Sequence, residues 1–515
     1  MGDEGLLVSF ALYLALLVAV GILSFRLSKT LSDFILGGRR LGAWVVAISA
    51  QASDMSAWLL MGLPGKVVEN GVSMVWVAIG CAGGTLFNWT HIARRLRRYS
   101  EILEALTLPE FLSARFHGQG QAMIRVLSLL IILVFYSSYI AAQFSAAGKT
   151  LSSTFNVGYH HALLASATVI IFYTMLGGFF AVAWTDLIQG MIMVMVVVAL
   201  PAIGIWHLGG ADTVISALAG KGPEMVQVSK GLGGWDLFGA LILGGLAWGL
   251  GYPGMPHVVV RYMAIKDDLE LRKSALISMV WVVFALWGAM AVGAVGLAQL
   301  GPGLDDYETV VPLLSKMYFP GWLAGLVISA IAAAIMSTVD SQILVLGSAI
   351  IEDFYRKLLH RQASDRLCMM LSRSVTLAIG VLAVMISWSS GQGVFGLVKY
   401  AWSGLAAGFG PALIMSLRWK RTSGWGAAAG MFAGVATVMI WRRLGLSESL
   451  IWELLPAFII SSAAIVIVSL LSPPPKKEVE AEFELAAATH LPLRDKHGNP
   501  IPIMEFEMVR DIMNK

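Results

Sequence analysis

The chain has 515 residues, of which 57% are hydrophobic and only 13% are charged, and its net charge is +4. Soluble domains carry about 25% charged residues, so this composition excludes an ordinary soluble protein and indicates a chain with many membrane-spanning helices. The small positive charge gives no support to nucleic-acid binding, and we expect it to serve contacts with anionic membrane lipids.

The apolar residues fall into thirteen segments that are long enough to cross a bilayer, which takes a helix of about 20 residues. We therefore predict an all-α polytopic membrane protein with thirteen transmembrane helices. The segments are residues 5–25, 41–65, 70–92, 122–148, 158–180, 185–207, 235–258, 274–299, 321–345, 369–388, 393–417, 424–442 and 450–472. We assign residues 1–472 to one transmembrane domain. The charged remainder, residues 473–515, is too short for a catalytic domain and is interpreted as a cytoplasmic tail with room for one short amphipathic helix.

Basic residues in the loops indicate the orientation, because the cytoplasmic loops of membrane proteins are enriched in Lys and Arg. The amino-terminal Met-Gly-Asp-Glu-Gly has none, whereas alternate loops are rich in them. These basic loops lie around residues 26–40, 94–115, 261–273, 356–373 and 418–421. We predict a multi-pass protein of the plasma (inner) membrane with its N-terminus outside and its C-terminus in the cytoplasm.

The second segment carries a carboxylate, Asp54, between two hydroxyls, Ser53 and Ser56. A carboxylate at the centre of a membrane costs about 2.5–3.5 kcal/mol on insertion scales, so it usually faces a partner, an ion or water. The ninth segment holds a second polar group, which consists of Ser337, Thr338, Asp340 and Ser341. Together the two groups predict an ion-coupled transporter.

The seventh segment is interrupted at residues 248–257, where two prolines and three glycines fall within ten residues. Proline removes a backbone hydrogen bond and glycine relaxes the chain, so we expect unwound backbone there, and also at the polar residues 53–56. The two interrupted segments are five spans apart, which is the pattern of an inverted repeat. We predict a 5+5 inverted-repeat core of the second to eleventh helices, in which helices 2 and 7 are broken and helices 1, 12 and 13 are peripheral.

Several motifs of this chain resemble signatures of the solute:sodium symporter family. They are residues 33–39, 51–56, 60–65, 177–186 and 336–338, and residues 247–257 and 400–402 are most similar to the proline-transporting branch of that family. The resemblance covers about residues 1–472. It implies a LeuT-like fold, alternating access and symport of sodium with L-proline. It also implies no cofactor besides the coupling ion and no obligatory protein partner.

The resemblance implies a sodium site between the second and ninth segments. Its ligands would be the backbone carbonyls of Ala52, Met55 and Ala334 and the hydroxyls of Ser337 and Thr338, with Asp54 supporting the ion. Uncharged oxygens suit this hard cation, and we expect no transition metal. The alternative for the two hydroxyls is ordinary bonding to the preceding turn of their own helix.

The resemblance also implies a substrate pocket, whose residues would be Ser56, Tyr139, Trp248, Tyr252 and Pro256. A flat pyrrolidine ring suits an aromatic wall, and Trp248 and Tyr252 lie four residues apart on one helical face. Gln143, one helical turn after Tyr139, would bring an amide into or near the pocket and could alter its selectivity toward a more polar solute. The alternative for the two aromatic residues is ordinary packing between helices.

We hypothesise a second cation or proton site at Asp186, Asp340 and Ser341, together with Ser337. The resemblance suggests it, because some relatives bind a second sodium with the corresponding aspartate and hydroxyls. The alternative is a hydrogen-bond network at an inner gate.

Other functions compete with symport of proline. Ala57, Lys66 and Gln143 depart from the pattern of proline symporters, so another amino acid or small organic solute is an open alternative. A transporter-like sensor is a further one, although the tail has no room for a kinase domain. We do not expect an enzyme, since no nucleophile–base pair appears and the histidines and the two cysteines, Cys81 and Cys368, lack metal-ligand spacing.

Overall fold

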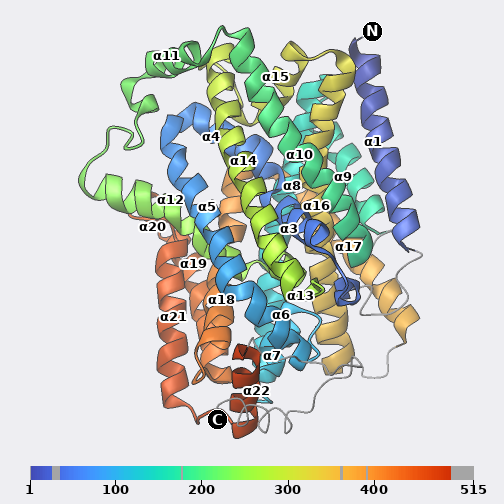
Figure 1. Cartoon of the computed structure of the whole chain (residues 1–515), viewed down its shortest axis with the longest axis vertical. Helices are drawn as coiled ribbons and strands as arrows, with labels where there is room; N and C mark the ends of the chain where they lie inside the picture. Colours follow the sequence, from blue (N-terminus) through green and yellow to red (C-terminus); the bar gives the residue numbers. More distant parts are fainter. Residues whose placement is uncertain (1, 26–34, 176–177, 360–363, 390–392, 489–515) are drawn as a thin grey trace.

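The apolar segments form helices because the interior of a membrane offers no partners for backbone N–H and C=O groups, which a helix satisfies within itself. The computed structural model describes residues 2–25, 35–175, 178–359, 364–389 and 393–488 (Figure 1). Within these residues, nine helices are long and apolar enough to cross a membrane by length and composition. All nine fall on predicted segments, which confirms a polytopic helical protein.

The helices run along the chain in the following order. Those before residue 230 are α1 (Gly2–Phe25), α3 (Ala43–Ala57), α4 (Leu63–Asn70), α5 (Val75–Phe87), α6 (Ala93–Ile102), α7 (Leu108–Ala114), α8 (Gln121–Phe155), α9 (Tyr159–Thr174), α10 (Phe179–His207) and α11 (Ala211–Lys221). Those after it are α12 (Gly244–Leu246), α13 (Pro256–Ala264), α14 (Asp268–Leu300), α15 (Val310–Tyr318), α16 (Gly321–Ser348), α17 (Asp365–Ser389), α18 (Val394–Arg418), α19 (Gly424–Arg443), α20 (Leu446–Ser449), α21 (Leu454–Leu471) and α22 (Lys477–Ala487). Among the described residues the one β pairing is a bridge between Leu41 and Ile265.

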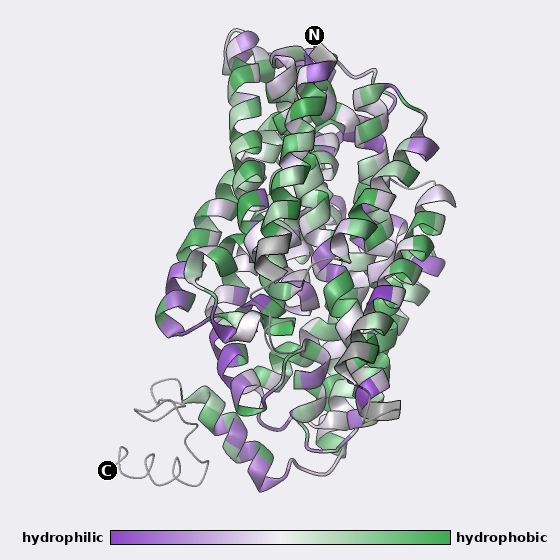
Figure 2. Cartoon of the chain, turned by 90° about the vertical axis from the view of Figure 1, so that its right-hand side faces the viewer, coloured by the Kyte–Doolittle hydropathy of each residue, from purple (hydrophilic) through white to green (hydrophobic). Residues whose placement is uncertain are grey.

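Hydrophobic residues cover the length of the bundle, and hydrophilic residues gather toward the end that carries α22 (Figure 2). The start of α1 and helix α22 lie at opposite ends of the bundle (Figure 1). The basic run on α6 lies at the same end as α22. Arg26, Lys29 and Arg361 of the predicted basic loops, and residues 489–515 of the tail, lie outside the described residues.

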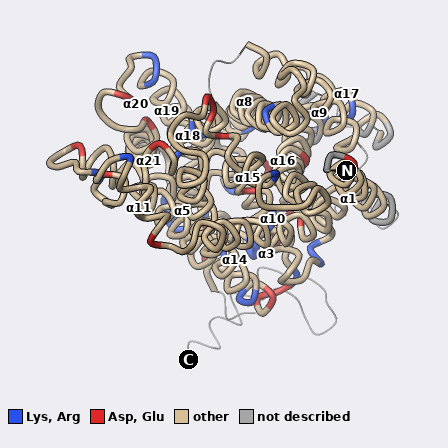
Figure 3. Tube along the Cα trace, turned by 90° about the horizontal axis from the view of Figure 1, so that it is seen from above, with Lys and Arg blue, Asp and Glu red and all other residues tan. Residues whose placement is uncertain are grey.

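The centre of the bundle is formed by α3, α10 and α16, which contact one another. Helix α1 packs against α16 and α10 on one flank, whereas α18, α19 and α21 pack together on another (Figure 3). The two polar groups predicted from the sequence lie on α3 and α16. They therefore lie on two of the three helices at the centre of the fold.

The second predicted segment is broken at Ser56, whose φ of 53° and ψ of −172° are not helical. The chain continues through a π-helical turn, Trp58–Gly62, into α4. The break frees backbone groups of α3 from their intrahelical partners, because a helix needs continuous torsion angles for its hydrogen bonds. The interruption predicted at residues 53–56 is confirmed.

The seventh predicted segment is also broken. A 3-10 stretch, Ala247–Gly254, leads to Met255 in an extended conformation, and α13 begins at Pro256. Proline is tolerated at the first position of a helix because its missing N–H would have no helical partner there. The sequence pattern of prolines and glycines therefore predicted this interruption correctly.

The charged tail contributes one short helix, α22, which packs against α6. Lys420, between α18 and α19, pairs with Glu484 at 2.6 Å and Glu480 at 3.2 Å. These carboxylates raise the pKa of Lys420 above its ordinary value, Glu484 first. His117 contacts Glu482 at 2.8 Å. The tail helix thus lies on the basic end of the bundle.

Candidate functional site

The hydroxyls of α16 meet the backbone of α3 just before the break. Ser337 Oγ donates to the Ala52 carbonyl at 2.9 Å, and Thr338 Oγ1 donates to the Ser53 carbonyl at 2.9 Å. Both hydroxyls also lie 3.3 and 3.0 Å from the Ala334 carbonyl of their own helix. The contact with α3 and the bonding to the preceding turn are therefore both present. The arrangement gathers uncharged oxygens between two helices.

The backbone carbonyls that the two hydroxyls contact differ in one position from the expected ligand set. Adjacent hydroxyls on α16 face the adjacent carbonyls of Ala52 and Ser53, and sequence reasoning did not name the Ser53 carbonyl. The Met55 carbonyl, which it did name, accepts the backbone N–H of Trp58 across the break. The consecutive positions of Ser337 and Thr338 were the available signal, since neighbours on one helix reach neighbouring groups on the other.

Asp54 is buried without a hydrogen-bond partner. The residue is 4% exposed, and within the described residues neither carboxylate oxygen reaches a donor at hydrogen-bond distance. Its backbone carbonyl lies 3.4 Å from the Tyr139 hydroxyl. A buried carboxylate without donors is costly, so this group is suited to a cation or to a ligand that brings donors.

The break in α3 is lined by three of the residues predicted for substrate. Ser56 Oγ accepts the N–H of Trp58 at 3.1 Å, and Gln143 Oε1 accepts the N–H of Ala57 at 3.0 Å. Gln143 Nε2 is buried and has no partner in the described part of the chain. Tyr139 lies on the same helix, α8, and reaches the Asp54 carbonyl. The structure thus brings Ser56, Tyr139 and Gln143 together at unwound backbone.

Trp248 belongs to a cluster of aromatic rings that are tilted against one another. Its ring centroid lies 5.0 Å from that of Trp58, 5.4 Å from Phe395 and 5.9 Å from Trp402. Tyr252 meets Trp402 edge to face at 5.3 Å. Trp248 and Tyr252 therefore lie near the break in α3. The rings that would form the aromatic wall are the same rings that pack between the helices.

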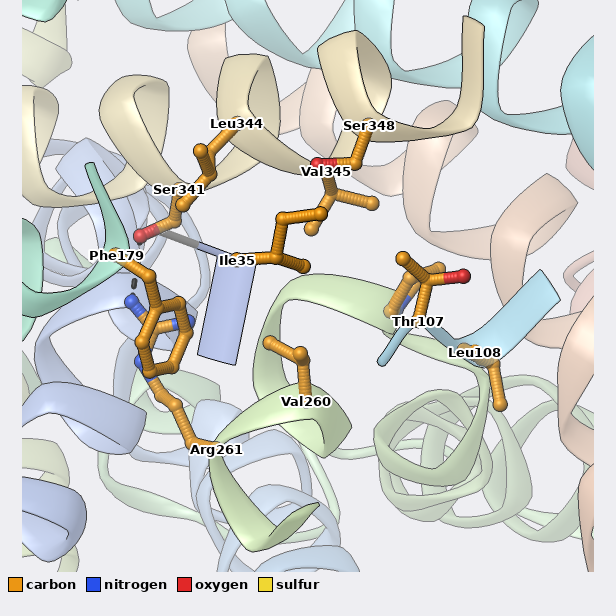
Figure 4. Close-up of a pocket in the computed structure, with 11 residues that line it drawn as sticks. Ile35, Thr107, Leu108, Phe179, Val260, Arg261, Ser341, Leu344, Val345 and Ser348 are labelled. Atoms are coloured by element: carbon orange, nitrogen blue, oxygen red, sulfur yellow. Dashed lines mark hydrogen bonds between the residues drawn. The ribbon is translucent and has the colours of Figure 1, made fainter. Parts of the chain in front are cut away.

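Pro256 begins α13. It lines a small pocket between α13 and α16, together with Phe179, Arg261 and Ser341. Figure 4 labels these last three residues in that pocket. The neighbouring His257 ring lies 6.2 Å from that of Tyr139, so this start of α13 is also near a residue predicted for substrate.

The group predicted as a second cation site contains an unexpected arginine. Arg261 Nη2 lies 2.8 Å from Asp186 Oδ2 and 2.6 Å from Ser341 Oγ, and Figure 4 shows Arg261 reaching toward Ser341. The same guanidinium donates to Ser49 at 2.7 Å and to Ser53 at 2.5 Å. Sequence analysis assigned Arg261 to a basic loop, which is wrong because it lies on α13 and is 1% exposed.

Asp340 is bonded elsewhere, since one of its oxygens accepts a hydrogen bond from Thr174 at the end of α9. The structure therefore brings Asp186 and Ser341 together around Arg261, while Asp340 has a different partner. Within the residues described, no three His, Cys, Asp or Glu side chains gather to hold a metal ion.

An open vestibule of about 1620 Å³ lies between α4, α8 and α18 and includes open solvent. Lys149 pairs with Asp306 at 2.7 Å and Glu308 at 2.5 Å at its edge. Phe395, which contacts Trp248, also lines it. Lys66 lies 2.5 Å from Glu69 and 5.5 Å above the Phe395 ring. The aromatic rings therefore lie where this vestibule ends.

Comparison with known proteins gives a consistent family match. The Sodium:solute symporter family matches residues 34–434. The high-affinity proline transporter PutP of Bacillus subtilis (strain 168) is 40% identical over 449 residues, which are 86% of this chain and 93% of that protein. The sodium/proline symporter of Escherichia coli (strain K12) is 39% identical over 465 residues, which are 89% of this chain and 91% of that protein.

Solved structures share the arrangement of helices. A Na+-coupled sialic acid symporter in a substrate-bound outward-open state superposes with a TM-score of 0.76 at 18% identity, over 92% of this chain and 99% of that one. MhsT in complex with L-phenylalanine gives a TM-score of 0.55 at 14% identity, over 84% and 98% of the two chains. At such identities the likeness concerns the fold alone.

Proposed function

Because this chain belongs to the sodium:solute symporter family, we propose that it imports L-proline together with sodium by alternating access. Members of this family are transporters and not enzymes. The relatives that match most of the chain are a proline transporter and a sodium/proline symporter by name. The helical fold is shared with a Na+-coupled sialic acid symporter and with MhsT.

The observation that supports sodium coupling most directly is the contact between α3 and α16. We assign the sodium site to the carbonyls of Ala52, Met55 and Ala334 and the hydroxyls of Ser337 and Thr338, with the Ser53 carbonyl as an added neighbour. Hydroxyls that already donate to carbonyls of the broken helix need only a small rotation to turn their lone pairs to a cation. Unwound carbonyls at a half-helix end are known to coordinate sodium in transporters with broken helices.

L-proline would lie beside the sodium site at the break in α3. We assign its aromatic wall to Trp248 and Tyr252 and its polar contacts to Ser56, Tyr139 and Gln143. The buried Asp54 belongs to this region, because its backbone carbonyl contacts the Tyr139 hydroxyl. It would stabilise the cation electrostatically, directly or through the unwound backbone. For Pro256 we propose a further substrate contact, since it follows the interrupted stretch that holds Trp248 and Tyr252.

We propose thirteen membrane crossings with a 5+5 inverted-repeat core, the N-terminus outside and residues 473–515 in the cytoplasm. Three observations support this topology. The start of α1 and helix α22 lie at opposite ends of the bundle, and the basic residues of α6 lie beside α22. The chain is also broken twice, within α3 and just before α13. An odd number of crossings between the breaks reverses the direction of the repeated unit.

The membrane potential and the sodium gradient together supply enough free energy to scavenge proline from a dilute medium. One sodium ion that enters with a neutral zwitterion moves one net charge, which contributes about 2.3 kcal/mol at about 100 mV. A tenfold sodium gradient adds about 1.4 kcal/mol. Together these terms support accumulation of about 500-fold.

The proposal predicts that proteoliposomes accumulate labelled L-proline only when an inward sodium gradient is imposed. The expected result is uptake that collapses when choline replaces external sodium and that rises with an inside-negative potential, because a positive charge enters with each substrate. Liposomes without protein are the control. Uptake of equal size with choline would contradict sodium coupling.

A second candidate substrate is a small amino acid or related solute with one more hydrogen-bond acceptor than proline. The supporting observation is Gln143 Nε2, a buried donor with no partner among the described residues. The same proteoliposomes distinguish the two candidates if unlabelled solutes compete with labelled proline. A solute that competes more strongly than proline would replace it as the substrate.

For Asp186 and Ser341 the geometry supports a hydrogen-bond network at an inner gate rather than a second cation site. The Arg261 guanidinium already neutralises Asp186 and donates to Ser49, Ser53 and Ser341, so this group holds no uncompensated negative charge for a further cation. Sodium would therefore bind at one site only.

We expect Asp340→Asn to leave the Hill coefficient for sodium near one, because asparagine retains an oxygen that accepts from Thr174. The measurement is initial uptake of proline against sodium concentration, compared with the unaltered protein. A coefficient near two that falls to one in the variant would restore the second cation site.

A further inference from the structure

A tryptophan from outside the predicted repeat contacts the proposed substrate wall. The ring centroid of Trp452, which lies two residues before the start of α21, is 5.0 Å from that of Trp248. Both residues are 4% exposed. Sequence analysis left the last two segments on the periphery and assigned them no role. Their hairpin nevertheless reaches the aromatic rings at the end of the vestibule.

Trp452 is held on three sides by groups of different kinds. Its indole Nε1 donates to Ser403 Oγ at 2.8 Å. The Lys399 ammonium lies 5.2 Å above its ring, and the Trp248 ring contacts it from another direction. A buried indole N–H usually has a hydrogen-bond partner, and here that partner fixes the orientation of the ring. Trp452 is therefore a rigid support and not a loosely packed surface residue.

The supported residue lies on backbone that is not a regular helix. Trp248 is part of the 3-10 stretch Ala247–Gly254, between positions rich in glycine. Its carbonyl accepts the indole N–H of Trp402 at 3.1 Å, and a Cβ on Gly251 would overlap that indole. Unwound backbone with glycine has more conformational freedom than a helix. The orientation of Trp248 therefore depends on neighbours from other helices.

Residues 402 and 403 connect the two tryptophans. Trp402 holds the backbone of Trp248, and Ser403, the next residue of α18, holds the indole of Trp452. Glu453 extends this arrangement to the vestibule, since its Oε1 lies 3.1 Å from Ser403 Oγ and the residue lines the open space. The same turn of α18 thus fixes both rings with respect to each other.

We propose that Trp452 is a positioning residue for substrate, which holds Trp248 in the orientation that receives the flat ring of L-proline. This inference rests on the proposed function, because it needs the substrate at Trp248. A preorganised aromatic wall strengthens binding because the ordering of the ring is complete before the substrate arrives. Sodium binds between α3 and α16 and does not touch this support.

The test compares Trp452→Ala, Trp452→Phe and Trp248→Ala in proteoliposomes, with Trp441→Phe as the matched control. Trp441 belongs to the same hairpin, but its indole donates to the Ile451 carbonyl. We expect Trp452→Ala to raise the KM for proline about tenfold, the equivalent of about 1.4 kcal/mol. The KM for sodium and the amount of protein in the membrane should stay unchanged. Trp452→Phe, which keeps an aromatic ring but loses the indole N–H that Ser403 accepts, should recover only part of the affinity.

The outcomes separate this inference from the proposed function. If Trp248→Ala raises the KM for proline and Trp452→Ala does not, the positioning role is overturned and the substrate pocket stands. If neither variant changes it, the pocket assignment falls as well. Where Trp452→Ala does not reach the membrane, Ser403→Ala decides. It removes the acceptor of the Trp452 indole, a loss that corresponds to about a fivefold rise in KM, and with it the hydroxyl that contacts Glu453 and the Lys399 carbonyl. An unchanged KM in Ser403→Ala overturns the inference.

Discussion

Replacing Asp54 with asparagine is expected to raise the sodium concentration needed for half-maximal proline uptake by about two orders of magnitude. The residue is 4% exposed, and within the described residues its carboxylate accepts no hydrogen bond. Its negative charge is therefore available to a cation. A unit charge about 5 Å from a cation contributes about 3 kcal/mol at an effective dielectric constant of about 20, which is a factor of about 200 in affinity.

The asparagine variant isolates the charge, because it keeps the volume of the side chain. Initial rates of proline uptake against sodium concentration give the measurement, at saturating proline. Asp340→Asn is the matched control, since Asp340 is also buried but accepts a hydrogen bond from Thr174. A sodium requirement in Asp54→Asn equal to that of the control would exclude Asp54 from the stabilisation of the ion.

The double change Ser337→Ala with Thr338→Val should raise the sodium requirement by about 100-fold. Two of the proposed oxygen ligands disappear, and the carbonyls of Ala52 and Ser53 lose their donors. The loss of a buried polar partner costs about 1–3 kcal/mol, so the two losses together account for an effect of this size. Valine keeps the shape of threonine, so packing between α3 and α16 is retained.

Thr338→Ser is the control for this pair, because it removes a methyl group and keeps the hydroxyl. It is expected to need nearly the same sodium concentration as the unaltered protein. Sodium titrations of uptake and of proline binding distinguish an effect on the ion from one on transport rate. If the double variant binds sodium as tightly as the control does, the site lies elsewhere.

The two expected effects have different physical origins and so different signatures. Loss of the Asp54 charge acts through an electrostatic interaction, whereas loss of the two hydroxyls acts through direct contact at hydrogen-bond range. The first effect should fall on any cation that the site accepts. The second should also change the preference between sodium and lithium, because the number and spacing of ligands set the fit to ionic size. Competition between the two ions tests this difference.

Residues whose chemistry acts locally were predictable from the sequence. Prolines and glycines between residues 248 and 257 break a helix wherever it packs, and both interruptions were found where they were expected. The hydroxyl pair Ser337 and Thr338 and the buried carboxylate Asp54 were recognisable because polar groups in an apolar segment need partners. Helical periodicity also predicted that Tyr139 and Gln143 share one side of α8.

The tertiary structure alone decided how residues from distant segments meet. Arg261 was predicted to belong to a basic loop. Its partners come from α3, α10 and α16, and no local sequence pattern indicates them. Trp452 and the Ser53 carbonyl were likewise missed. A sequence determines which segments are apolar and where a helix breaks, since these follow from neighbours along the chain. The faces that two helices present to each other depend on the packing of the whole bundle, and that packing positions Arg261 and Trp452.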